Sequence, residues 1–86
     1  MIVHIPSPLR SYTNDKSKVE MEGATVRELL ENLDRDFPGF RFRIIDEQDG
    51  IRKHIKIFRN TDMITTIDTT LGDVKDVHII CALSGG

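Results

Sequence analysis

The chain has 86 residues, and its 12 Lys and Arg against 14 Asp and Glu give a net charge of −2. This balance argues against a domain whose main partner is nucleic acid or an anionic membrane. The length fits one domain, and 38% apolar with 30% charged residues indicate a soluble globular protein rather than a disordered chain.

The single cysteine, Cys81, excludes an internal disulfide and a four-cysteine metal or iron–sulfur site. The longest apolar stretch near the end, residues 77–83, is too short to span a bilayer. No signal peptide is readable at the start, where Pro6 and Pro8 precede the first basic residue, Arg10. We therefore expect a cytoplasmic protein without a membrane partner.

The first segments predict a hairpin with a long loop. Residues 2–5 are rich in β-branched side chains and predict a strand that stops at Pro6. Residues 7–14 have the composition of a turn region. Residues 18–21 alternate polar and apolar side chains, which predicts a short half-buried strand.

A helix is predicted over residues 25–36. Thr25 and Glu28 have the spacing of a capping box, in which each side chain satisfies a free backbone N–H. Pro38 and Gly39 end the helix. Its apolar stripe follows helical spacing and consists of Val26, Leu29, Leu30 and Leu33.

Short strands separated by turns are predicted for the rest of the chain. The expected strands are Ile44 with Ile45, then residues 54–58, 63–67 and 77–82, and the expected turns are residues 46–50, 60–62 and 71–73. The order of strand, strand, helix and strands predicts an α+β fold of the β-grasp type. In this fold a mixed sheet of four to five strands packs on one main helix, and the first and last strands lie parallel at its centre. We expect residues 1–83 to form the domain and residues 84–86 a flexible tail.

Strand alternation predicts which side chains face a partner. Ile55 and Ile57 should share the core face with Val77, Ile79 and Cys81. Phe58 and Ile80 should then be apolar side chains on an otherwise polar outer face, which suggests a docking patch. The alternative is that they are scattered surface residues. Leu83, just before the tail, is a further apolar candidate for docking.

Several other residues have an ordinary structural explanation. His54 and His78 should lie on the outer face, where two histidines alone make a poor zinc site. Packing, rather than redox chemistry, is the favoured role for Cys81. A solvated surface is expected for Asp34, Arg35, Asp36, Arg41 and Arg43. An RNA-binding surface made of Arg41, Arg43, Arg52 and Lys53 is disfavoured by the net charge.

The end of the chain resembles the ThiS/MoaD family of sulfur-carrier proteins. Residues 71–79 lead into the final strand and are followed by Ser84, Gly85 and Gly86, as in that family. Residues 5–10 and the helix start at 25–30 are similar to the members that deliver sulfur in cysteine and other small-molecule biosynthesis. Many members have a proline before the tail, where this chain has Cys81 and Ala82.

The resemblance implies a protein that is acted on by enzymes and is not itself an enzyme. An activating enzyme would use ATP to adenylate the Gly86 carboxylate, which would then become a thiocarboxylate. Ser84 and Gly85 would thread into the activating enzyme, and glycine allows a close approach there. A second partner would accept the sulfur, and no cofactor is expected on the chain itself.

Two other functions remain open at this stage. A ubiquitin-like modifier would use the same activated Gly86 to form an isopeptide bond with a lysine. A β-grasp binding module would carry Gly85 and Gly86 only incidentally. The sequence does not specify the pathway, the sulfur donor or the acceptor.

Overall fold

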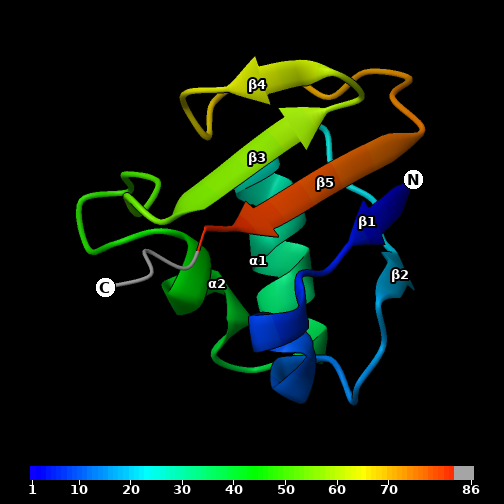
Figure 1. Cartoon of the computed structure of the whole chain (residues 1–86). Helices are drawn as coiled ribbons and strands as arrows, with labels where there is room; N and C mark the ends of the chain where they lie inside the picture. Colours follow the sequence, from blue (N-terminus) through cyan, green and yellow to red (C-terminus); the bar gives the residue numbers. More distant parts are fainter. Residues whose placement is uncertain (83–86) are drawn as a thin grey trace.

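The computed structural model describes residues 1–82. One five-stranded sheet has the order β2-β1-β5-β3-β4. The helix α1 (Val26–Asp36) lies across one face of this sheet and leaves the other face open (Figure 1). The strands are β1 (Ile2–His4), β2 (Lys18–Glu20), β3 (Ile55–Arg59), β4 (Asp62–Ile64) and β5 (Asp76–Cys81), and the short helices are η1 (Ser7–Tyr12) and α2 (Phe40–Ile44).

The two central strands run parallel, as predicted for the first and last strands. In this pair Val3 lies beside Val77, whereas the β1–β2, β3–β5 and β3–β4 pairs are antiparallel. A parallel pair needs a crossover connection, and α1 is part of it. The predicted α+β architecture, with a mixed sheet on one main helix, is confirmed.

The core lies between α1 and the sheet. All four residues of the predicted helix stripe are buried, and β3 and β5 contribute buried Ile57 and Ile79 from the sheet side. The capping box is present, because the Thr25 hydroxyl accepts a hydrogen bond from the Glu28 N–H at 3.2 Å. The Glu28 carboxylate in turn accepts at 3.2 Å from the N–H of Ala24, the residue before the N-cap, rather than from that of Thr25. These bonds fix the first turn of α1.

The strand predicted at Ile44 and Ile45 is not formed, because α2 includes Ile44 and Ile45 makes only an isolated bridge with Ile51. Gly39 adopts a left-handed conformation with φ of 94°, which turns the chain after α1. The Asp34 carboxylate then accepts from the N–H of Gly39 at 3.0 Å and of Arg41 at 3.2 Å. These donors belong to the start of α2, so the Asp34 cap favours a helix there. It does so although the apolar residues of this segment alternate as in a strand.

Two further segments differ from the predictions. The region 7–14 contains the helix η1, whose Leu9 is buried, rather than turns alone. The strand predicted at 63–67 is β4, which stops at Ile64. The chain then turns to α1, where Ile67 accepts a hydrogen bond from the Arg27 N–H at 2.8 Å. Because the Ile67 carbonyl satisfies a free N–H of the first helical turn, the chain leaves the sheet after Ile64.

Within residues 1–82, no helix is long and apolar enough to cross a membrane.

Candidate docking face and the end of the last strand

The outer face of the sheet is formed as strand alternation predicted. Ile57 pairs with Ile79, and both are buried under α1. The adjacent pair of Lys56 and Ile80 therefore points to the opposite face. Ile80 is 46% exposed, which is high for a large apolar side chain in a central region of a sheet.

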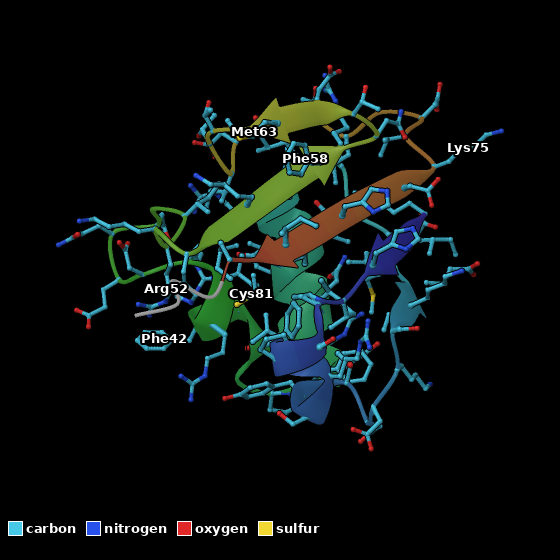
Figure 2. The ribbon with its side chains drawn as sticks, viewed as in Figure 1. Phe42, Arg52, Phe58, Met63, Lys75 and Cys81 are labelled. Atoms are coloured by element: carbon cyan, nitrogen blue, oxygen red, sulfur yellow. The ribbon has the colours of Figure 1, made fainter. Side chains whose placement is uncertain are left out.

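Three apolar side chains lie on this face along β3, β4 and the end of β5, and we call them the apolar patch: Phe58, Met63 and Ile80. Phe58 is half-buried and pairs across the strands with Met63, which is 54% exposed (Figure 2). The sequence reasoning missed Met63. The two-residue loop of Asn60 and Thr61 was the available signal, because a tight hairpin places Met63 directly opposite Phe58.

The outer face carries a histidine pair that the sequence did not indicate. His78 stacks on His4 of β1, with ring centroids 4.1 Å apart. His4 Nε2 lies 2.8 Å from an Asp76 carboxylate oxygen. This hydrogen bond is the main cause that lowers the pKa of Asp76 below its ordinary value. Within the part of the chain that the structure describes, no group of three or more His, Cys, Asp or Glu could hold a metal ion.

The described chain ends beside the start of β3. The Ala82 N–H donates to the His54 carbonyl at 2.7 Å, which extends the β3–β5 pairing by one step. Cys81 is half-buried and packs against the edge of the core, as its predicted packing role requires. The predicted tail and docking residues Leu83, Ser84, Gly85 and Gly86 lie outside the described residues.

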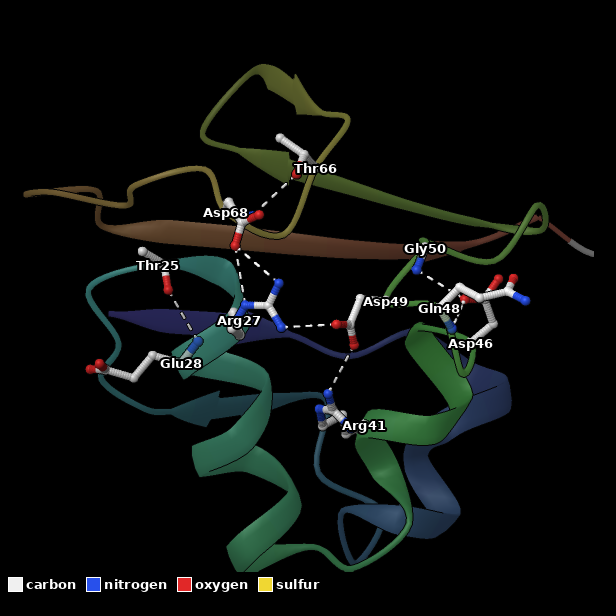
Figure 3. A network of polar contacts seen from close by, with 10 residues as sticks. All are labelled: Thr25, Arg27, Glu28, Arg41, Asp46, Gln48, Asp49, Gly50, Thr66 and Asp68. Carbon is white, nitrogen blue, oxygen red and sulfur yellow. Dashed lines mark hydrogen bonds and ion pairs between the residues drawn. The ribbon is translucent and has the colours of Figure 1, made fainter.

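A polar network ties the loops on the helix side to α1 (Figure 3). Arg27 bonds Asp49 at 3.0 Å and Asp68 at 3.1 Å, and Arg41 reaches the other oxygen of Asp49 at 3.2 Å. Asp46 closes its own loop by accepting from backbone N–H groups, which lowers its pKa. Asp34 and Arg41 are partly exposed, as expected, and their side chains also have structural roles, because Arg41 bonds Asp49 and Asp34 caps the start of α2.

Three of the four basic residues considered for RNA have partners within the chain. Arg41 belongs to the network of Figure 3, and the Arg43 guanidinium lies over the Tyr12 ring. Arg52 stacks on Phe42 with 4.7 Å from its guanidinium carbon to the ring centroid.

Comparison with known proteins identifies the class. Residues 3–86 match the model of the ThiS family, so the chain belongs to this family. Its structure is similar to a chain in the Amycolatopsis orientalis BexX/CysO complex, with 26% identity and a TM-score of 0.90. That match covers 99% of this chain and 98% of the other. No curated protein sequence matches the chain.

Two more distant structures share the fold. CysO from Mycobacterium tuberculosis, described as an antigen, has 23% identity and a TM-score of 0.87, covering 95% of this chain and 98% of its own. Small archaeal modifier protein 1 from Methanosarcina acetivorans has 21% identity and a TM-score of 0.78, covering 99% and 94%. These two likenesses show the shared fold, and the family match shows that the chain is a small ThiS-type protein that is not itself an enzyme.

Proposed function

We propose that this chain is a sulfur carrier that is activated at Gly86 and donates sulfur in the biosynthesis of a small molecule. The observation that carries the proposal is the ThiS-family match, which runs through residue 86 and so includes Ser84, Gly85 and Gly86. The similarity to a chain of the BexX/CysO complex supports an activity that requires an enzyme partner.

The chemistry uses the chain as a substrate. A Gly86 carboxylate oxygen attacks the α-phosphorus of ATP in the activating enzyme, forming an acyl-adenylate and releasing pyrophosphate. Sulfide then attacks the carbonyl carbon and expels AMP, leaving a thiocarboxylate after loss of the sulfide proton. Gly85 has no Cβ, which allows this segment to enter a narrow nucleotide site. The resulting sulfur is the nucleophile that attacks the acceptor.

The apolar patch is the proposed contact with the activating enzyme, and Leu83, which follows β5 in the sequence, is a further proposed docking residue. Exposed apolar side chains on a polar face gain most from being covered by a partner. Phe58 and Met63 lie on neighbouring strands, and Ile80 lies on β5, the strand that leads to the tail. A partner covering the patch is therefore positioned to receive the residues that follow β5.

The test is thiolation followed by intact-mass spectrometry. The protein is incubated with ATP, a sulfide source and the adenylating enzyme encoded by a neighbouring gene. We expect a mass gain equal to one sulfur replacing one oxygen, located at Gly86 by fragmentation. Deletion of Gly86 should abolish the gain, and so should a one-residue extension, because an amide then replaces the carboxylate.

The competing functions give different products in the same assay. Isopeptide bonds from Gly86 to lysines of other proteins, without a thiocarboxylate, would favour the modifier. No modification of Gly86 with any adenylating enzyme of the genome would favour a binding module. Cys81→Ser should still be thiolated, and loss of thiolation in the folded variant would show that the sulfur passes through Cys81.

A further inference from the structure

A second surface lies at the β4 edge of the sheet and adjoins the apolar patch, with which it shares Met63. A groove of about 200 Å³ opens between the residues preceding β3 and the end of β4. Its floor is formed by the buried Ile55 and Ile64. Its walls contain the half-buried Ile51 and the 54% exposed Met63, so apolar surface is accessible inside it.

The charged side chains that line this groove are all basic. They are Arg52, Lys53 and Lys56, and no Asp or Glu lines the groove. Arg52 is partly engaged, since it donates to the Phe42 carbonyl at 2.8 Å and lies near Asp46. Lys53 and Lys56 are exposed and form no ion pair within residues 1–82. In a chain with a net charge of −2, this local excess of positive charge favours an acidic ligand.

The backbone beside the groove leaves room for an extended segment. β4 pairs with β3 through Ile57, Phe58 and Arg59, and then turns away after Ile64. Ile55 and Lys56 therefore have no partner strand on the groove side, although the Ile55 N–H already donates to the Arg52 carbonyl at 2.9 Å. A segment in the groove is thus held mainly by its side chains rather than by strand addition.

We propose that this groove binds an extended segment of a partner protein that carries apolar side chains flanked by acidic ones. The apolar side chains contact Ile51 and Met63, and the acidic ones pair with Lys53 and Lys56. The aliphatic lining favours a peptide over RNA, since single-stranded RNA binds mainly by stacking on aromatic side chains. This inference does not depend on any chemistry at Gly86.

Fluorescence anisotropy with a defined probe tests the proposal. The probe is a fluorescein-labelled peptide with a Val-Ile-Val centre flanked by glutamates, and its controls carry flanking lysines or a serine centre. The double variant Lys53→Glu/Lys56→Glu should bind the probe at least about tenfold more weakly than the wild type. The matched control Lys16→Glu/Lys18→Glu makes the same charge change near β2, at the opposite edge, and should stay within about twofold.

The outcomes separate the possibilities. Support requires saturable binding of the glutamate probe, weaker binding of both control peptides, and amide shift changes in NMR spectra at Ile55 and Ile64. If circular dichroism shows that Lys53→Glu/Lys56→Glu is unfolded, Lys53→Gln/Lys56→Gln replaces it. This variant should weaken binding of the probe about threefold or more. Equal losses in both double variants, or no saturable binding, would overturn the proposal. Tighter binding of a uridine-rich RNA at the same lysines would overturn it in favour of nucleic acid.

Discussion

The outer face of the sheet has two halves that differ in chemistry although the same alternation forms both. On β3, β4 and the end of β5 it carries the apolar patch. Across β2, β1 and the start of β5 it carries His4 stacked on His78, with Asp76 and Lys18 nearby. The pleat decides which side chains point outward, and the residue type decides whether a partner or water covers them.

The two halves also differ in what satisfies their side chains. On the polar half, the imidazoles stack on each other and His4 bonds Asp76, so that half is satisfied within the chain. On the apolar half, Met63 and Ile80 remain about half exposed with no covering element among residues 1–82. This contrast supports the assignment of docking to the patch rather than to the histidines.

The largest effect is expected when the same substitution is made on the buried face and on the outer face of β5. Ile79 is 2% exposed and its neighbour Ile80 is 46% exposed. Ile79→Asp should cost several kcal/mol, because it buries a carboxylate without a partner. Ile80→Asp should change the free energy of unfolding by less than about 1 kcal/mol. Urea denaturation measures both, and a large loss for Ile80→Asp would show that its side chain supports the fold rather than a partner.

The next effect concerns the partner and compares the two halves directly. Phe58→Asp should weaken binding to the activating enzyme by about 30-fold or more, since a central apolar contact contributes at least about 2 kcal/mol. Lys18→Ala on the polar half changes the net charge by the same amount and should alter binding by less than about threefold. Calorimetric titration gives both values. Equal effects would indicate general electrostatics and not a docking patch.

Much of this contrast could be predicted from the sequence because it depends on local periodicity. The helix over 25–36, its capping box and the outward position of Phe58 and Ile80 followed from spacing alone. The histidine pair could not be predicted from spacing, because the stacking of His4 on His78 depends on the register between the first and last strands. A register joining strands so distant in sequence is set by the assembled sheet.

The prediction for the segment after α1 was wrong for a related reason. Phe40, Phe42 and Ile44 alternate with arginines, which is a strand pattern in isolation. The hydrogen bonds from Gly39 and Arg41 to Asp34 make it a helix, and Phe42 is left 54% exposed. A single side-chain cap supplied by the preceding helix outweighed the local pattern.

The smallest effect tests the polar half through its pH dependence. The hydrogen bond from His4 lowers the pKa of Asp76, and the charges of His4, His78 and Lys18 act in the same direction. A carboxylate whose pKa is lower in the folded state stabilises the protein above its unfolded pKa. That contribution is present at neutral pH and is lost as the pH falls through the ordinary aspartate pKa toward the lower, folded one.

Asp76→Asn should therefore reduce the urea midpoint slightly at pH 7, and the difference from the wild type should shrink as the pH falls below that range. The control is Asp73→Asn, whose carboxylate is exposed and forms no hydrogen bond or ion pair within residues 1–82. This control should follow the wild type at every pH. A difference for Asp76→Asn that persists undiminished in acid would mean that the Asp76 side chain stabilises the sheet by packing. The polar half would then be stabilised by packing rather than by electrostatic contacts. In that respect it would resemble the apolar half more than the stacked histidines suggest.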